Sequence, residues 1–277
     1  MSDFLLEVSG LTRTFGEVRA VDEVSFTLAK AGSLGIVGES GSGKTTTARI
    51  IVGLERAEGG VVRVHGEEQS AGGRGRAARL ARARRIQMVF QDPYLSLDPR
   101  TSVQDVLRET LKLHFPDIDH ASRIRELLDR VGLGTRAAEA RPRELSGGQR
   151  QRVAIARAIA VEPAILVLDE AVAALDVSVQ AQILNLLADI REQTGIGYLF
   201  ITHDLGVVRC VTDDVIVMRR GRIVEAGRTA DVLTSPQHPY TQLLLASVPR
   251  PGWDPKAIGQ ARRALADAAE GRPAKAG

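Results

Sequence analysis

Two stretches of the sequence carry residue types that could act on phosphate groups, and the first is Gly38–Thr45, GESGSGKT. It matches the pattern G-x4-G-K-[ST] between an apolar run at 34–37 and a predicted helix. The glycines allow backbone N–H groups to converge on an anion, and a helix N-terminus adds positive partial charge. Lys44 can neutralise phosphate charge, and Thr45 can ligate Mg²⁺. An ordinary glycine turn is the alternative, but the flanking strand and helix favour a phosphate-binding loop.

The second stretch is ILVLDEAVAALD, residues 165–176. Its apolar start is typical of a strand buried on both faces of a parallel sheet, yet the strand ends in Asp169 and Glu170. Ligands of parallel α/β sheets bind beyond the carboxyl ends of the strands, so we expect this end to lie near the phosphate-binding loop. Asp169 could then hold Mg²⁺ and Glu170 could act as a base toward water. Two exposed turn carboxylates are the alternative, which leaves the apolar strand before them unexplained.

Hydrophobic patterns predict the elements that must position these residues. The first part of the chain reads as strands with one helix, residues 102–160 read mainly as amphipathic helices, and strands then alternate with helices. This alternation predicts a parallel sheet with covering helices. The predicted strands are 5–8, 18–26, 34–37, 61–64, 86–90, 165–169, 197–202 and 214–218, and the predicted helices are about 44–54, 178–193 and 205–211.

Composition excludes several classes of protein. The 277 residues carry a net charge of only +3, so charge alone does not indicate a nucleic-acid-binding protein, and none is expected as a partner. The single cysteine, Cys210, allows no disulfide within the chain, and the five histidines are scattered, so we expect no metal but Mg²⁺. No apolar run is long enough to span a membrane. The arginine-rich segment 74–85 fits a solvated helix face better than an anion-binding surface.

Further motifs resemble those of ATP-binding-cassette (ABC) ATPases. Residues 145–152, LSGGQRQR, resemble the signature of that family, and the resemblance covers about residues 4–249. Gln91, after IQMVF, resembles the Q-loop residue, and His203, in LFITHDL, resembles the switch histidine. Asp176 resembles the D-loop aspartate, and Phe15 resembles the aromatic residue that stacks on adenine. Taken alone, Phe15 could be a core aromatic and His203 a structural histidine; the order and spacing of the whole set favour the functional interpretation.

The resemblance implies a fold. It is an α/β P-loop NTPase (RecA-like) core with a mostly parallel sheet, an N-terminal antiparallel β-subdomain and an inserted helical subdomain. It also implies an ABC ATPase domain at 4–249 that includes the helical subdomain at about 95–160. Residues 250–277, rich in small and charged residues, are expected to form a poorly ordered C-terminal tail.

The resemblance further implies hydrolysis of ATP with Mg²⁺ by a head-to-tail dimer, in which each ATP lies between one chain's phosphate-binding loop and the partner's signature. Glu170, His203 and Gln91 are expected to be catalytic, Asp176 to act across the dimer, and Thr45, Gln91 and Asp169 to hold Mg²⁺. The residues expected to bind ATP are Phe15, Gly38, Ser40, Gly41, Ser42, Gly43, Lys44, Thr45 and Thr46, and those expected to meet the partner's ATP are Ser146, Gly147, Gly148 and Gln149.

Two segments resemble the oligopeptide, dipeptide and nickel importers within this family: residues 91–100, QDPYLSLDPR, and residues 235–249, SPQHPYTQLLLASVP. This implies a peripheral subunit at the cytoplasmic face of the plasma membrane that powers peptide import. Its implied partners are a second ATPase chain (itself or a paralogue), two transmembrane permease subunits and an extracytoplasmic substrate-binding protein. Nickel or another small solute remains an alternative cargo, and an ABC ATPase without a role in transport remains an alternative of another class.

The segment that links Glu170 to Asp176 departs from the pattern of the family that the chain resembles. Ala171, Val172 and Ala173 stand where that pattern has Pro, Thr and Ser, so this turn lacks a φ-fixing proline and two hydroxyl groups. Some nickel-importing relatives resemble this Ala-Val sequence. The retained Asp176 predicts a functional loop across the dimer, and the effect of the three substitutions stays open.

Overall fold

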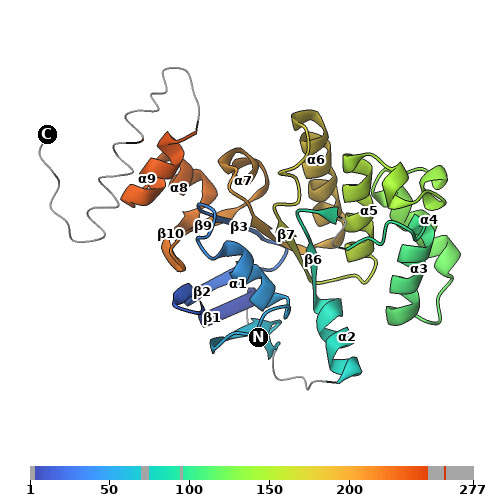
Figure 1. Cartoon of the computed structure of the whole chain (residues 1–277), viewed down its shortest axis with the longest axis horizontal. Helices are drawn as coiled ribbons and strands as arrows, with labels where there is room; N and C mark the ends of the chain where they lie inside the picture. Colours follow the sequence, from blue (N-terminus) through green and yellow to red (C-terminus); the bar gives the residue numbers. More distant parts are fainter. Residues whose placement is uncertain (1–3, 70–74, 94–95, 249–258, 260–277) are drawn as a thin grey trace, which may run out of the picture.

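A computed structural model describes residues 4–69, 75–93, 96–248 and 259. Its centre is a six-stranded sheet with the strand order β10-β9-β3-β8-β7-β6 (Figure 1). The strands β9, β3, β8, β7 and β6 are parallel to their neighbours, and β10 pairs antiparallel with β9. Their bounds are β3 Ser33–Val37, β6 Ile86–Val89, β7 Ile165–Asp169, β8 Gly197–Ile201, β9 Asp214–Arg219 and β10 Arg222–Arg228.

The central strands are buried on both faces, which explains their unbroken apolar sequences. Every residue of β3, β7 and β8 is buried. Alternate residues of one strand enter different cores: Ile165 and Val167 pack on the side of the second sheet, whereas Leu166 and Leu168 pack on the side of the helices. This two-residue alternation places apolar side chains on both sides of the sheet.

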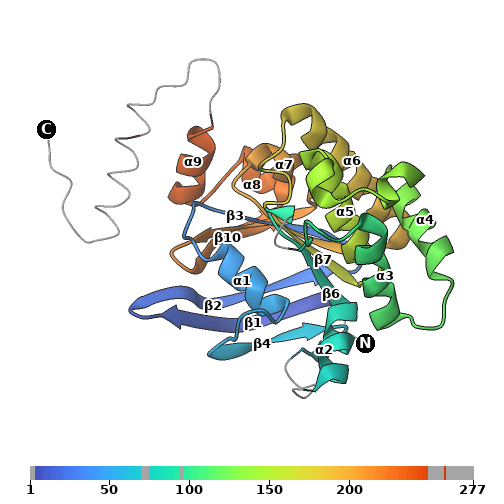
Figure 2. The same cartoon turned by 45° about the vertical axis from the view of Figure 1, so that its right-hand side comes forward.

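A second, antiparallel sheet has the order β2-β1-β4-β5 and comes from the first part of the chain. It packs with the helix α1, Lys44–Ile51, against one face of the six-stranded sheet, as Figure 2 shows. The strands are β1 Phe4–Phe15, β2 Val18–Ala29, β4 Gly59–Val64 and β5 Glu67–Glu68. Both β1 and β2 are longer than predicted, because register shifts between them allow pairing to continue past Gly10.

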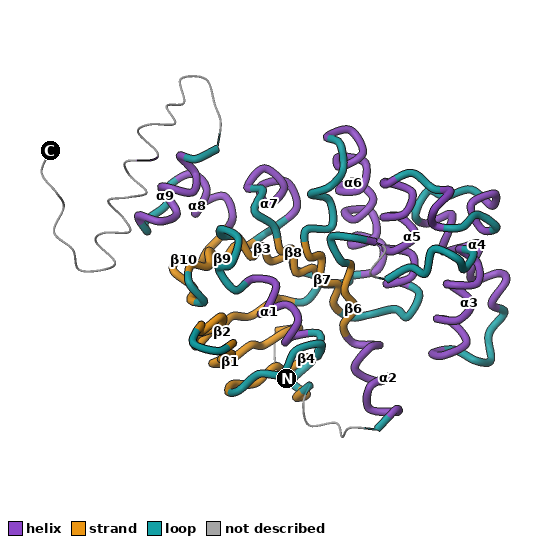
Figure 3. Tube along the Cα trace, in the orientation of Figure 1, coloured by secondary structure: helices purple, strands orange, loops and turns teal. Residues whose placement is uncertain are grey.

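Helices between β6 and β7 form the inserted helical part of the predicted fold (Figure 3). They share a core with the neighbouring α6, Val177–Thr194, and with the adjacent face of β7 and β8. Their bounds are α3 Val103–His114, α4 His120–Arg130 and α5 Gly147–Ile159, with the short 3₁₀ segments Thr135–Ala138 and Pro142–Glu144 between α4 and α5.

The remaining helices lie elsewhere around the sheet. Helix α7, Leu205–Val211, packs over β3, and α8 Thr229–Thr234 and α9 Pro239–Ala246 lie at the β10–β9 end of the sheet (Figure 1). The arginine-rich segment forms α2, Arg76–Arg85, which has no buried residue among those described. In the described ranges, no helix is long and apolar enough to cross a membrane. The predicted tail 250–277 lies outside the described residues except Gly259.

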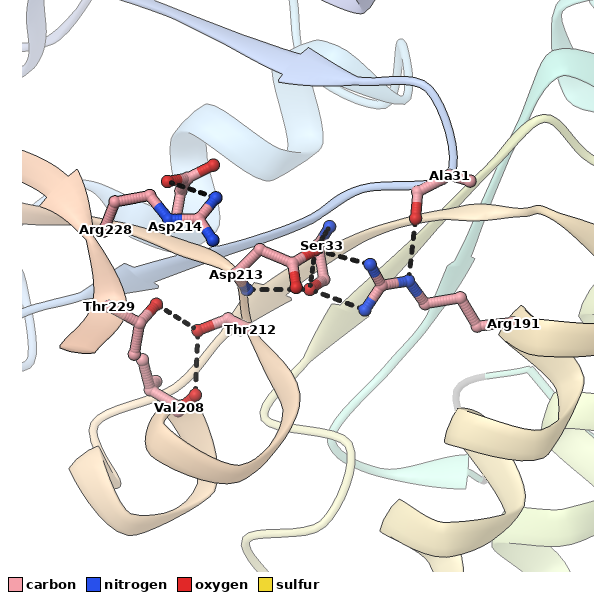
Figure 4. A network of polar contacts seen from close by, with 9 residues as sticks. All are labelled: Ala31, Ser33, Arg191, Val208, Thr212, Asp213, Asp214, Arg228 and Thr229. Atoms are coloured by element: carbon pink, nitrogen blue, oxygen red, sulfur yellow. Dashed lines mark hydrogen bonds and ion pairs between the residues drawn. The ribbon is translucent and has the colours of Figure 1, made fainter.

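A polar clamp ties the C-terminal end of α6 to the start of the sheet (Figure 4). The Asp213 carboxylate, just before β9, accepts hydrogen bonds from the backbone N–H and the hydroxyl of Ser33 at 2.9 Å each. The Arg191 guanidinium of α6 pairs with Asp213 at 2.5 Å and donates to the Ala31 carbonyl at 2.8 Å. The clamp therefore joins α6 to the amino ends of β3 and β9, whereas the phosphate-binding loop follows the carboxyl end of β3.

The structure also differs from the predicted elements near the phosphate-binding loop. We did not predict β10, which pairs antiparallel with β9 after the turn at Arg220 and Gly221. Both turn residues have positive φ, 47° and 81°, which is typical of a tight hairpin. The helix predicted at about 44–54 ends at Ile51, and Gly53 at φ 78° follows it closely.

Candidate functional site

The phosphate-binding loop connects β3 to α1 and has close backbone packing. Gly43 has φ 102°, and a Cβ atom there would lie 2.2 Å from the Ala20 carbonyl oxygen, so only glycine fits without a shift. Ser42, Gly43 and Lys44 are buried, whereas Ser40 and Gly41 are exposed, and Thr45 and Thr46 are half-buried. The first turn of α1 contains no acidic residue, so its N-terminus presents uncompensated positive partial charge.

Lys44 is held by the loop itself. Its ammonium group donates to the carbonyl oxygens of Gly38 and Glu39 at 2.8 Å each and lies 3.4 Å from the Ser42 hydroxyl. Burial lowers the pKa of Lys44, although the charges of Glu170, Asp169 and Glu39 oppose this shift. A buried cation held at this helix N-terminus can meet the negative charge of a phosphate group.

Asp169 meets Thr45 across the sheet. The Thr45 hydroxyl donates to the Asp169 carboxylate at 3.2 Å, which joins the end of β7 to the start of α1. Burial raises the pKa of Asp169; the bond from Thr45 opposes the rise, and the charge of Glu170 adds to it. A hydroxyl and a carboxylate are ligands that Mg²⁺ prefers, and a cation would compensate the desolvated carboxylate, so the two side chains fit that ion.

Glu170 and His203 form the next pair. Their side chains approach to 3.1 Å between Glu170 Oε1 and His203 Nδ1, and His203 follows β8, which lies between β3 and β7. Glu170 has φ 48°, the left-handed region that a non-glycine residue rarely adopts, and its N–H donates to the Ile201 carbonyl at 2.8 Å. The fold thus holds Glu170 in a strained conformation directly beside Asp169.

Other predicted residues lie around this group. Gln91 is exposed just after β6, at the same sheet edge as Asp169. Phe15, at the end of β1, is 45% exposed with the Arg13 guanidinium 4.7 Å above its ring, so it is not a core aromatic. Within the described parts of the chain, no group of three or more His, Cys, Asp or Glu residues could hold a metal ion.

The signature residues form the start of α5. The Ser146 hydroxyl accepts from the Gln149 N–H at 3.3 Å, and the Gln149 side chain accepts from the Ser146 N–H at 2.9 Å. This reciprocal capping box orders the turn that contains Gly147 and Gly148. Figures 1 and 2 place α5 among the helices beyond β6 and β7, apart from α1. One chain therefore does not bring its signature to its own phosphate-binding loop.

Asp176 caps the N-terminus of α6. Its carboxylate accepts from the Val179 N–H at 3.0 Å and from the Ser178 hydroxyl at 2.7 Å, and these bonds lower its pKa. The preceding turn, which departs from the family pattern, places Ala171 and Val172 in the core shared with the helices. Apolar packing thus takes the place of the missing hydroxyl groups at these two positions.

Sequence reasoning missed Tyr240, whose side chain contacts the loop. The Glu39 N–H donates to the Tyr240 hydroxyl of α9 at 3.0 Å, although 201 positions separate the two residues. Residues 235–249 stand out in the sequence only through their resemblance to relatives, and no spacing rule links Tyr240 to the loop. The one signal in the sequence is a tyrosine near the start of the short helix Pro239–Ala246.

Fold and site together define a nucleotide-binding protein of the P-loop class. A model of the ABC transporter family matches residues 21–173, and a model of the oligopeptide/dipeptide transporter C-terminal region matches residues 224–273. The chain therefore belongs to the ABC transporter family, as the motifs predicted, and is an ATP-binding ATPase subunit.

Relatives agree with this assignment. The chain is 44% identical over 261 residues to the oligopeptide transport ATP-binding protein OppF of Bacillus subtilis, covering 92% of this chain and 85% of the relative. It is 48% identical over 248 residues to the glutathione import ATP-binding protein GsiA of Escherichia coli, with coverages of 89% and 40%. It is 49% identical over 242 residues to the oligopeptide transport ATP-binding protein OppD of Mycobacterium tuberculosis, with coverages of 87% and 39%. The chain thus spans less than half the length of the last two proteins.

Solved structures show the same fold. The structure of cbiO1 from Clostridium perfringens, part of the ABC transporter complex cbiONQ, has a TM-score of 0.75 at 27% identity and covers 84% of this chain and 92% of that chain. The dimeric post-hydrolysis state of the ATP-binding cassette MJ0796, bound to ADP and Pi, has a TM-score of 0.72 at 28% identity, with coverages of 81% and 98%. The predicted fold class is confirmed.

Proposed function

We propose that this chain hydrolyses ATP to power an ABC importer for peptides. The supporting observation is the juxtaposition of Lys44, the Thr45–Asp169 pair and the Glu170–His203 pair at the carboxyl ends of three adjacent strands. In this proposal the ATPase domain spans 4–249, with a helical subdomain at about 95–160 and a tail at 250–277.

The loop binds the phosphate groups of ATP. Backbone N–H groups of residues 40–46 surround the β-phosphate, Lys44 neutralises charge, and Phe15 stacks on the adenine. Thr45 and Asp169 would hold Mg²⁺, with Gln91 as a further ligand. Bound Mg²⁺ supplies electrostatic stabilisation of the charge that develops on the transferred phosphoryl group.

Glu170 accepts a proton from the attacking water. Its carboxylate lies beside the proposed Mg²⁺ ligand Asp169, and its strained backbone fixes the direction of the side chain. His203 positions Glu170 through their 3.1 Å contact and would contact the γ-phosphate of bound ATP. Strain at a catalytic residue favours preorganisation, because the side chain need not reorient during the reaction.

A second chain completes each site. The Ser146–Gln149 turn lies apart from α1 within one chain, so a head-to-tail partner would bring its own turn to the ATP. The start of α5 then presents N–H groups to the γ-phosphate, and Asp176 acts across the same interface. The partner is a second copy or a paralogue.

Peptides are the proposed cargo. The match of residues 224–273 to the oligopeptide/dipeptide transporter region, and relatives named for oligopeptide transport and glutathione import, support this substrate class. The chain then works at the cytoplasmic face of the plasma membrane with two permease subunits and an extracytoplasmic binding protein. Nickel is the second candidate, which the Ala171–Val172 sequence favours.

The substitution Glu170→Gln tests the catalytic proposal. It removes the base but keeps the side-chain shape, so we expect ATP binding to persist, turnover to fall by about 100-fold or more, and ATP to trap a dimer. Fluorescent nucleotide titration, phosphate release and gel filtration measure the three outcomes. Glu162→Gln is a matched control, because Glu162 also has a positive φ (55°) but precedes β7 and pairs with Arg123 on the surface. Turnover like the parent's in Glu170→Gln would refute the base assignment.

The cargo is tested in the assembled transporter. Co-expression with its permease subunits and binding protein should yield a complex whose ATPase rate rises when the binding protein carries peptide. Ni²⁺ in place of peptide should give no rise. Stimulation by Ni²⁺ alone would reassign the substrate and leave the ATPase proposal intact.

A further inference from the structure

One peptide group of the phosphate-binding loop is held from both sides. The carbonyl of Gly38 and the N–H of Glu39 belong to the same peptide unit and point in opposite directions, since the peptide bond is trans. The carbonyl accepts from Lys44 at 2.8 Å, and the N–H donates to the Tyr240 hydroxyl at 3.0 Å. Rotation of this unit would therefore break both bonds, so Tyr240 and Lys44 are linked through it.

Tyr240 is itself firmly placed. It is 2% exposed, and the Arg219 guanidinium lies 4.9 Å from its ring centre. The imidazole of His238 caps α9 by accepting from the Tyr240 N–H at 3.1 Å. One carboxylate of β10, Glu225, accepts from the N–H groups of Gln237 at 2.7 Å and His238 at 3.1 Å, which fixes the entry to α9. The Tyr240 hydroxyl therefore contacts the loop from a helix whose start is fixed by hydrogen bonds.

The same side of the loop contacts the end of β9. Gly38 has φ 152°, and a Cβ atom there would lie 2.2 Å from the Met218 carbonyl oxygen. The Gly221 N–H, in the β9–β10 turn, donates to the Ser42 carbonyl at 3.0 Å. The loop is thus enclosed by backbone from β9 and from the β9–β10 turn and by the Tyr240 hydroxyl of α9, all from the C-terminal part of the chain.

We infer that Tyr240 is a positioning residue for nucleotide binding, through which the C-terminal region sets the conformation of the phosphate-binding loop. The hydroxyl fixes the peptide unit between Gly38 and Glu39, and the carbonyl of that unit orients the Lys44 ammonium toward the phosphate site. This inference rests on the proposed role of the loop in ATP binding. In this inference, the segment that matches the oligopeptide/dipeptide transporter C-terminal model contributes to nucleotide binding by the ATPase.

Tyr240→Phe tests the inference, with Tyr198→Phe as a matched control. Both side chains are buried, at 2% and 1% exposure, and each hydroxyl makes a backbone hydrogen bond; Tyr198 donates to the Leu187 carbonyl at 2.8 Å, away from the loop. Tyr240→Phe keeps the ring contacts and removes only the hydroxyl. We expect the Kd for ATP to rise about three- to tenfold, which corresponds to the loss of one ordinary hydrogen bond. The KM for ATP should rise with it while kcat changes little.

Hydrogen exchange separates positioning from a general loss of stability. In Tyr240→Phe, amide exchange should accelerate in the peptide that contains residues 38–43, whereas Tyr198→Phe should leave that peptide and the Kd unchanged. Equal Kd shifts in both variants, or a parental Kd and parental exchange in a folded Tyr240→Phe, would overturn the inference.

Lys44→Ala provides an independent check on the site itself. If this variant binds ATP like the parent, the proposed role of the loop fails, and the inference about Tyr240 fails with it. If Lys44→Ala loses ATP binding as expected, the loop does bind the nucleotide. The Kd and exchange measured in Tyr240→Phe then test the positioning role of the Tyr240 hydroxyl alone.

Discussion

At the scale of single residues, Asp169 shows where folding and the proposed function oppose each other. The carboxyl group is 7% exposed, and burial raises its pKa above the ordinary 3.8. A group whose pKa is raised in the folded state binds its proton more tightly there than in the unfolded chain. Stability is therefore unaffected below pH 3.8 and falls as the pH rises through the folded-state pKa. A neutral side chain at position 169 would not lower the stability of the folded protein in this way as the pH rises.

We accordingly predict that Asp169→Asn raises the melting temperature of the nucleotide-free protein at pH 7 and abolishes Mg²⁺-dependent hydrolysis. A rise of a few degrees is expected, since about 1 kcal/mol corresponds to roughly 2–4 °C in a protein of about this size. Thermal melts between pH 4 and pH 8 check it, and the two proteins should converge near pH 4. Asp189→Asn, at an exposed position of α6, should change neither quantity. A lower melting temperature in Asp169→Asn at pH 7 would contradict the argument.

At the scale of elements, α6 is fixed at both ends. Its N-terminus is capped by Asp176, and its C-terminal end is clamped to β3 and β9 by Arg191, Ser33 and Asp213 (Figure 4). Burial raises the pKa of Asp213, but the hydroxyl and N–H of Ser33 and the charge of Arg191 lower it overall. The cap and the clamp thus connect α6 both to the turn after β7 and to the start of β3, the strand that leads into the phosphate-binding loop.

We predict that Asp213→Asn destabilises the protein by about 1 kcal/mol at pH 7, after allowance for partial solvent screening. A depressed carboxyl pKa stabilises the fold above the unfolded value of 3.8 and loses that effect as the pH falls below it. The difference in unfolding free energy between parent and variant should thus shrink below pH 4, as urea titrations at several pH values would show.

The neighbouring residue provides the control for this prediction. Asp214 pairs with Arg228 at 3.8 Å, and both side chains are well exposed, so Asp214→Asn should have an effect near zero. Equal destabilisation by the two variants would indicate a nonspecific charge effect in place of the clamp.

At the scale of the whole molecule, one chain contains all parts of the proposed ATP site but does not bring them together. The phosphate-binding loop, Asp169, Glu170 and His203 meet at one sheet edge, whereas the signature turn lies beyond β6 and β7 (Figure 1). A head-to-tail dimer of this chain would contain two composite sites, each with a loop from one copy and a signature from the other. A variant with an inactivated loop and a variant with an inactivated signature should therefore complement each other when they are mixed.

We predict that Lys44→Ala and Ser146→Arg are each inactive in hydrolysis, yet regain activity when mixed. In the mixed dimer one site combines both defects, and the other combines an intact loop with an intact signature. The phosphate-release rate of the mixture should exceed the sum of the separate rates. Addition of Lys44→Ala to Glu170→Gln should give no recovery, because both defects lie on the loop side. No recovery in either mixture would indicate a paralogue as the natural partner.

The sequence by itself determined the local structures of this protein. The phosphate-binding loop, the strand that ends at Asp169 and the alternation of strand and helix are encoded by neighbouring residues, through glycine geometry and hydrophobic period. Those rules predicted β3, β7, β8 and α7 closely, and they indicated the family through the order of its motifs.

Only the tertiary structure decided which of these parts meet. The insertion of β8 between β3 and β7, which brings His203 to Glu170, depends on the summed packing of three cores and not on any local pattern. The bond from Glu39 to Tyr240 likewise joins segments that lie 201 positions apart in the chain. Such contacts form because they bury apolar surface and satisfy backbone polar groups in the folded molecule, and these energies have no signature within a short stretch of sequence.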